Sequence, residues 1–234
     1  MKKKQNNSEL TEIVFVLDRS GSISDVVSDT IGGFNSMIKR QKEEVSKAFV
    51  TTVLFDDKID IIHDRAKIED VPMLTEKEYY ARGCTALLDA VGSTIKHISN
   101  IHKYARKDDI PSKTLFIITT DGYENASREY SMTRVKSMIE KQKTENKWDF
   151  LFLGANIDAI ETASKIGIEE DYVANVINDK KGVEASYKAV SNFIYCRRAK
   201  SKLPKNWKEE IDKDIKKRKN ITKGLDIPSF LKRK

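Results

Sequence analysis

Short apolar runs alternate with amphipathic segments along most of this chain, and no other sequence feature constrains the fold as strongly. Residues 12–17, 113–120 and 148–153 are rich in apolar and β-branched residues, which is typical of strands buried on both faces of a parallel sheet. A weaker strand is expected over 172–176. Apolar residues that recur every three or four positions separate these runs and predict helices. Strands that alternate with helices predict an α/β fold with helices on both faces of the sheet.

The first predicted helix has its apolar face at Val27, Ile31, Phe34, Ile38 and Val45, with Ser24 or Asp25 as its N-cap. Further apolar faces predict helices near residues 87–102, 132–139, 159–166 and 183–194.

Residues 49–55 and 59–63 flank the polar triplet at 56–58, a pattern that predicts a β-hairpin. The hairpin adds an antiparallel edge to an otherwise parallel sheet. The expected architecture is therefore Rossmann-like: a doubly wound, mostly parallel central sheet with one antiparallel edge strand. Sheets of this kind bind ligands at the carboxyl ends of their strands.

The charge of this chain is divided unevenly along its length. Its formal net charge is +7, but residues 197–234 alone contain 15 Lys and Arg against 5 Asp and Glu, so the remainder is slightly acidic. We therefore expect a polar N-terminal extension (1–9), one domain (10–196) and a basic C-terminal tail (197–234). Apolar residues in the tail are spaced for a partly amphipathic helix: Trp207, Ile211, Ile215 and Leu225. The tail is either solvated or docked on the domain, or it binds nucleic acid or another acidic partner.

A cytoplasmic location without membrane insertion is expected. The longest uninterrupted apolar stretch, Ile13 to Leu17, is far shorter than the roughly 18 residues that a membrane-spanning helix needs. The basic start of the chain is followed by polar residues rather than by the apolar segment of a signal peptide. Only Cys84 and Cys196 are present, without CxxC spacing, which favours reduced thiols.

Three loops at or near the ends of predicted strands carry oxygen-bearing side chains. Asp18, Ser20 and Ser22 follow the first strand at positions i, i+2 and i+4, so their side chains point to one side of an extended loop that Gly21 allows to turn tightly. Thr85 begins the second long helix, and Asp121 ends the strand at 113–120. Hard oxygen ligands suit Mg²⁺, Mn²⁺ or Ca²⁺ and disfavour zinc.

This ordered combination of D-x-S-x-S, a distant Thr and T-D-G resembles the metal-ion-dependent adhesion site (MIDAS) of von Willebrand factor type A domains over residues 10 to 196. The resemblance implies that Asp18, Ser20, Ser22, Thr85 and Asp121 bind a divalent cation. It further implies that the cation keeps one position for an acidic residue of a partner protein. The sequence is also similar to uncharacterised bacterial and phage-associated members, for which no partner is defined.

Two residues depart from the family pattern without removing a ligand. Ile23 replaces a common Met, and Arg19 stands between Asp18 and Ser20, where it either forms a salt bridge or steers an acidic partner. Among neighbouring polar residues, Asp89 is expected as a hydrogen-bond acceptor behind the ligands or as a surface group. Glu124 and Asn125 are expected either to bind loop backbone or to play a plain turn role.

Other interpretations of the same residues remain open. A D-x-S-x-S segment is also a helix N-cap signal, and Cys84 is expected as a small packed thiol. The three histidines, His63, His97 and His102, lack metal-ligand spacing and are expected to be structural or exposed.

The sequence thus predicts a non-enzymatic, divalent-cation-dependent protein-interaction module. One alternative is a Mg²⁺-dependent phosphohydrolase of the haloacid dehalogenase type, but the second Asp that such enzymes need is replaced here by Ser20. Nucleotide-binding and serine-hydrolase motifs are absent. The other alternative is nucleic-acid or polyanion binding through the basic tail.

Overall fold

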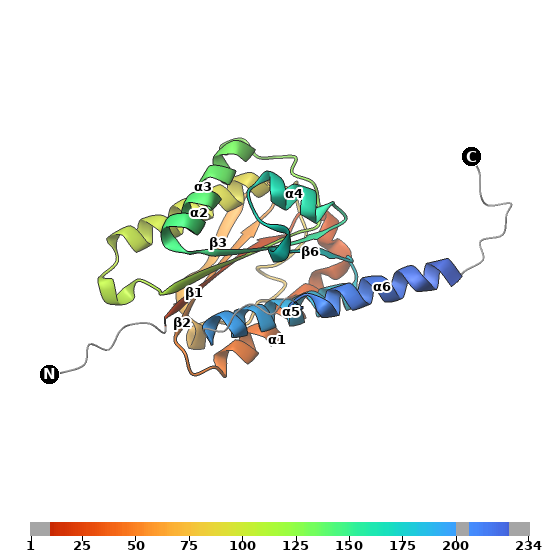
Figure 1. The fold of residues 1–234 in the computed structure, drawn as a ribbon, viewed down its shortest axis with the longest axis horizontal. Helices are drawn as coiled ribbons and strands as arrows, with labels where there is room; N and C mark the ends of the chain where they lie inside the picture. The colour runs from red at the N-terminus through yellow and green to blue at the C-terminus, as the bar shows by residue number, and fades with distance from the viewer. Residues whose placement is uncertain (1–9, 200–205, 225–234) are drawn as a thin grey trace.

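A six-stranded sheet runs through the middle of the molecule (Figure 1) in a computed structural model that describes residues 10–199 and 206–224, with side chains of the last helix as far as Arg218. The strands are β1 (Thr11–Asp18), β2 (Ala48–Phe55), β3 (Ile59–Lys67), β4 (Lys113–Thr120), β5 (Asp149–Ala155) and β6 (Val173–Val176). Their order is β3-β2-β1-β4-β5-β6, and only β3 is antiparallel to its neighbour. The predicted doubly wound sheet with one antiparallel edge strand is confirmed.

Helices cover both faces of this sheet, as Figure 1 shows. One face packs against α1 (Val27–Lys42) and α5 (Lys180–Arg198), and the other against α2 (Leu87–Tyr104), α3 (Met132–Asn146) and α4 (Ala159–Lys165). A last helix, α6 (Glu209–Gly224), packs against α5 and extends beyond the body of the domain. Short 3₁₀ turns lie at Gly21–Val26, Ile68–Asp70, Lys107–Asp109 and Glu170–Tyr172.

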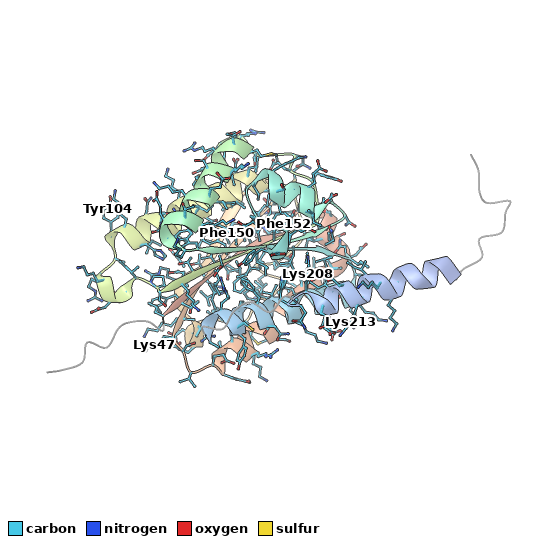
Figure 2. The ribbon with its side chains drawn as sticks, viewed as in Figure 1. Lys47, Tyr104, Phe150, Phe152, Lys208 and Lys213 are labelled. Atoms are coloured by element: carbon cyan, nitrogen blue, oxygen red, sulfur yellow. The ribbon has the colours of Figure 1, made fainter. Side chains whose placement is uncertain are left out.

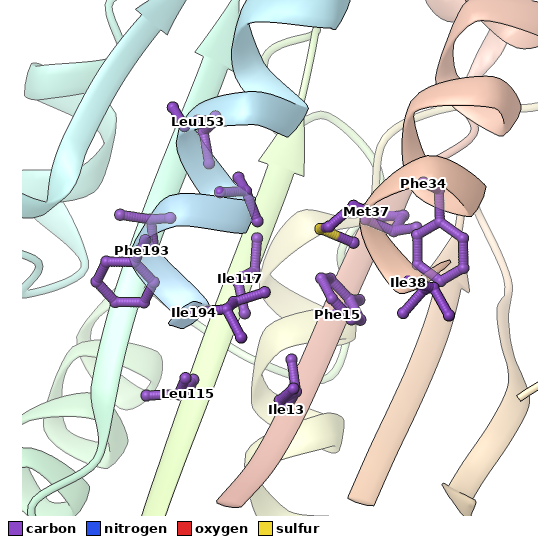
Figure 3. Packing of buried hydrophobic residues seen from close by; sticks show 14 of the residues in the cluster. Ile13, Phe15, Phe34, Met37, Ile38, Leu115, Ile117, Leu153, Phe193 and Ile194 are labelled. Carbon is purple, nitrogen blue, oxygen red and sulfur yellow. The ribbon is translucent and has the colours of Figure 1, made fainter. Parts of the chain in front are cut away.

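Two hydrophobic cores lie on the two faces of the sheet because side chains alternate along each strand. In β1, Ile13 and Phe15 belong to the core beneath α1 and α5, whereas Val14 and Val16 belong to the core beneath α2 and α3. Figure 3 shows the first core, where side chains of α1 and α5 meet those of β1, β4 and β5. Since every residue of β1 is buried, this strand is held from both sides.

The first helix departs from its prediction at both ends. Ser24 and Asp25 lie inside the Gly21–Val26 3₁₀ turn, and no side chain caps α1 by a hydrogen bond. Val45 is fully exposed, because α1 ends at Lys42 and the chain must reverse before β2 begins at Ala48. The other predicted helices and strands are present, and the largest difference is in α3, which continues from the predicted 132–139 to Asn146.

The beginning of the C-terminal tail is docked on the domain. Trp207 and Ile211 are buried in the core beneath α1 and α5. The Trp207 indole donates to the Asp171 carbonyl at 2.7 Å, and Lys208 Nζ donates to the carbonyl of Val173 in β6 at 2.8 Å. Figure 2 shows Lys208 and Lys213 along this stretch of the tail. The predicted extension at 1–9, Leu225 and the last three basic residues lie outside the described residues.

Within the described part of the chain, none of the helices has the length and apolar character needed to cross a bilayer.

We predict that Trp207→Ala lowers the free energy of unfolding by about 3 kcal/mol, because the substitution leaves a cavity beside Phe193, whose ring contacts the indole. Tyr104→Ala is the control, since Tyr104 is 77% exposed and its loss should cost less than about 0.5 kcal/mol. Urea unfolding of both variants measures the difference. Equal stability of the two variants would show that Trp207 is not part of the core.

Candidate metal centre

The candidate centre lies where the sheet changes its direction of winding. β1 and β4 are neighbouring parallel strands, with Leu17 opposite Thr119, so Asp18 and Asp121 leave the sheet side by side. The chain after β1 enters α1 on one face, and the chain after β4 leads to α3 on the other. This divergence opens a crevice at the carboxyl ends of the two strands, the usual ligand position in such sheets.

In the first loop, Asp18 is almost completely buried and its two oxygens accept different hydrogen bonds. Asp18 Oδ1 accepts from the Ser20 amide and Oδ2 accepts from Thr120 Oγ1, both at 2.7 Å. The Ser20 and Ser22 hydroxyl oxygens lie 3.1 Å apart. These three residues therefore lie together, although Ser22 is in the Gly21–Val26 3₁₀ turn and not in the extended loop that was expected.

The other two loops reach the same point from β4 and from the start of α2. Asp121 Oδ1 accepts from Ser22 Oγ at 2.5 Å. Gly122 lies close to the Thr85 and Ser22 hydroxyls. A Cβ added at this glycine would be 3.2 Å from Thr85 Oγ1 and 3.5 Å from Ser22 Oγ. The structure thus brings the loops that carry all five predicted residues to one place, and a side chain at Gly122 would crowd two of the hydroxyls.

Two buried carboxylates meet here without a positive partner. Asp18 is 2% exposed and Asp121 is 6% exposed. Burial raises the pKa of Asp18 above its usual value, and burial, together with the charge of Asp18, raises the pKa of Asp121 to about 6. Within residues 10–199 and the described part of the tail, neither carboxylate forms an ion pair. Two carboxylates surrounded by three hydroxyls form a donor set that fits a hard divalent cation.

Arg19 is paired inside the domain, so the suggestion that it steers a partner is wrong. Its side chain is 3% exposed, and its guanidinium forms ion pairs with Asp56, at 2.8 Å from Nε, and with Asp60. Arg82 also reaches Asp56, at 2.6 Å. These carboxylates come from the β2–β3 hairpin, which sequence spacing alone does not place beside Arg19. The cluster fastens the Asp18 loop to the segment that leads to Thr85.

Gly21 begins a 3₁₀ turn, as expected of a tight turn there, but the left-handed backbone near the centre occurs at Gly83. Gly83 has φ +65°, and a Cβ there would lie 2.1 Å from Asp57 Oδ1, so a larger residue would be strained. The Gly83 carbonyl accepts from the Gly21 amide at 3.3 Å. Gly83 therefore holds the first and second loops together.

Glu124 and Asn125 bind loop backbone, the first of the two roles expected for them. Asn125 Oδ1 accepts from the Thr85 amide and Glu124 Oε2 accepts from the Leu88 amide, each at 2.9 Å. Asp89 accepts from three successive amides, at residues 128 to 130. These bonds fasten the loop after β4 to the start of α2, and they fix the position of Thr85.

Asn178 and Tyr79 also contact the centre, although neither was expected from the sequence. Asn178 Nδ2 donates to Asp121 Oδ2 at 2.9 Å, and the buried Tyr79 hydroxyl donates to the Asp18 carbonyl at 2.6 Å. Both residues lie in irregular connections far along the chain from their partners, so no local spacing indicates them.

The remaining chemically active side chains have other surroundings. Cys84, which follows the turn at Gly83, is exposed, contrary to the expected packed thiol. Each histidine is hydrogen-bonded within the fold: His63 to Thr52, His97 to Asp64 and His102 to Glu12.

We predict a pH-dependent difference in stability between the metal-free protein and Asp121→Asn. The raised pKa of Asp121 means that the folded state binds this proton more tightly than the unfolded state does. The free energy of unfolding of wild type should therefore rise by about 2 kcal/mol relative to that of the variant as pH falls from 7 to 4, and this gain should be lost as pH rises through 6. Urea unfolding in EDTA across this range measures the difference. A difference that does not change with pH would contradict the prediction.

Comparison with solved structures identifies similar domains at low sequence identity. One is proximal thread matrix protein 1 from the mussel byssus with a zinc-occupied MIDAS motif (TM-score 0.54, 17% identity, covering 82% of this chain and 47% of that chain). Another is a von Willebrand factor type A protein from Catenulispora acidiphila (TM-score 0.55, 16% identity, covering 80% of this chain and 42% of that chain). A third is the pilus adhesin SpaC from Lactobacillus rhamnosus GG (TM-score 0.62, 12% identity, covering 83% of this chain and 31% of that chain).

This chain spans less than half the length of each of these three proteins. At such identities the likeness establishes the fold, not a shared activity. No protein-family model and no curated protein sequence matches the chain.

Proposed function

Since the chain has the von Willebrand factor type A fold, we propose that it is a divalent-cation-dependent protein-interaction module. The observation that carries this proposal is the pair of buried carboxylates, Asp18 and Asp121, which face three hydroxyls and have no cationic partner among the described residues. Burying two like charges at one point is unfavourable, and a bound cation removes that cost.

We propose that Asp18, Ser20, Ser22, Thr85 and Asp121 hold the ion, and that the ion is Mg²⁺, with Mn²⁺ and Ca²⁺ as alternatives. When bound, the ion would supply a positive charge, and one carboxylate of a partner protein would fill its remaining coordination position. The two aspartates contribute the charge, and the hydroxyls contribute neutral oxygens, so the ion keeps its attraction for a further carboxylate. Ser22 lies at the exposed side of the centre and Tyr123 nearby is 65% exposed, which supports access by a partner.

A binding role is favoured over phosphoester hydrolysis. The hydroxyl of Ser20 stands where a haloacid dehalogenase-like enzyme needs its second carboxylate, and it is hydrogen-bonded to Ser22. Among the described basic residues of the tail, Lys213 is paired with Glu209 and Glu210, and Arg218 with Asp179 and Asp214, which leaves fewer charges there for a polyanion. Cys84 and Cys196 do not form a disulfide, which supports the proposed cytoplasmic location.

Calorimetric titration of the metal-free protein with MgCl₂ or MnCl₂ tests the metal site. We expect wild type to bind one ion and Asp121→Ala to bind at least about tenfold more weakly, since it loses a charged ligand. Asp25→Ala is the matched control, because Asp25 is an exposed carboxylate in the turn that follows the first loop, and it should bind as wild type does. Zinc belongs in the same series, given the zinc-occupied MIDAS of the mussel protein. Absence of wild-type binding at millimolar ion would overturn the proposal.

The interaction itself is tested by affinity capture from the source cell. Wild type should retain a partner in Mg²⁺ and release it in EDTA, whereas Asp18→Ala should retain none in either buffer. A partner captured equally by both proteins, with or without Mg²⁺, would show that the metal centre does not mediate the contact.

A further inference from the structure

A segment far from the three metal-site loops also touches the candidate centre. Asn178 follows β6, and its amide donates to Asp121 Oδ2 at 2.9 Å and lies 3.5 Å from the Ser22 carbonyl. The other oxygen of the same carboxylate, Oδ1, accepts a hydrogen bond from the Ser22 hydroxyl. The two oxygens of Asp121 are thus divided: one faces the hydroxyls of the centre, and the other is held by Asn178.

The residue after Asn178 is fixed by two independent elements. Asp179 is the N-cap of α5, where its Oδ1 accepts from the Gly182 amide at 2.9 Å. Both carboxylate oxygens of Asp179 also bind the guanidinium of Arg218 in α6, with Nη2 at 3.0 Å from Oδ1. An ion pair across 39 residues therefore connects the C-terminal helix to the segment that carries Asn178.

Helix α6 is itself oriented to make this contact. Ile211, Asp214 and Arg218 are spaced by three and four residues and so share one face of the helix. Ile211 is buried in the core, and Asp214 binds Arg218 Nη2 at 2.7 Å. The burial of Ile211 fixes this face of the helix against the domain, and the ion pair with Asp214 holds the Arg218 side chain where it contacts Asp179.

We propose that Asn178 is a positioning residue of the metal centre, and that α6 holds it in place through the Arg218–Asp179 pair. This inference rests on the metal site proposed above. Groups that hydrogen-bond to metal-ligating carboxylates orient the ligand before the ion arrives, and their loss commonly weakens metal binding about 10- to 100-fold. The basic tail would then contribute to the centre through one arginine, apart from any contact with a polyanion.

Asn178→Leu tests the first half of the proposal, because leucine has a similar shape but no amide donor. Calorimetric titration with MgCl₂ should show about tenfold weaker binding than wild type. The thermal midpoint of the metal-free variant should stay within about 3 °C of wild type, since Asn178 is only half-buried. A purely structural role predicts the opposite pattern, with a lowered midpoint and unchanged metal affinity.

Arg218→Gln tests the second half, with Lys213→Gln as the matched control. Lys213 lies on the same helix, but its ion pairs are with Glu209 and Glu210 inside α6. We expect Arg218→Gln to bind Mg²⁺ severalfold more weakly, Arg218→Lys to recover most of the affinity, and Lys213→Gln to match wild type. In the metal-free protein, amides at 178–183 should exchange hydrogen faster in Arg218→Gln than in the control.

The outcomes separate this inference from the proposed function. If wild type binds no divalent ion, the proposed metal site fails, and the role of Asn178 fails with it. If wild type binds and both Asn178→Leu and Arg218→Gln bind equally well, only the present inference is overturned. If Asn178→Leu alone weakens binding, Asn178 keeps its role and the contribution of α6 is refuted.

Discussion

The pairing of β1 with β4 is the constraint on which the rest of this molecule depends. Because the two strands are parallel neighbours, their carboxyl ends place Asp18 and Asp121 together at the crevice of a doubly wound sheet. Covering that end with loops buries both carboxylates, which removes water from two like charges. The hydrogen bonds from Thr120, Ser20 and Ser22 relieve part of this cost, and a cation would relieve the rest.

The side chains that support the centre come from several separate parts of the chain. Arg19 and Arg82 meet Asp56 of the β2–β3 hairpin, Asn125 holds the Thr85 amide, and Asn178 holds Asp121. Each of these bonds joins two segments that would otherwise be independent loops. The five oxygen-bearing side chains are therefore positioned before any ion is present, and such preorganisation lowers the entropic cost of binding.

Features with a local period could be predicted from the sequence. The buried strands and amphipathic helices follow from spacings of two and of three to four residues, and the D-x-S-x-S and T-D-G segments lie directly at strand ends, where the fold class alone brings them together. Features that depend on distant segments could not be predicted. Arg19 has the sequence context of an exposed charge, yet the hairpin supplies its acidic partners. Likewise, the contact of Asn178 with Asp121 joins residues 57 positions apart, and Asn178 itself comes after a weak edge strand.

The docked start of the tail also protects an edge of the sheet. β6 is the last strand, and an uncovered edge strand offers its backbone to other chains, which promotes aggregation. Lys208 donates a hydrogen bond to the Val173 carbonyl of that strand. The buried Trp207 indole donates one to the Asp171 carbonyl just before it. A chain cut after α5 would expose this edge and the apolar surface beneath Trp207 together. Trp207 and Lys208 therefore cover part of an edge whose exposure would favour self-association.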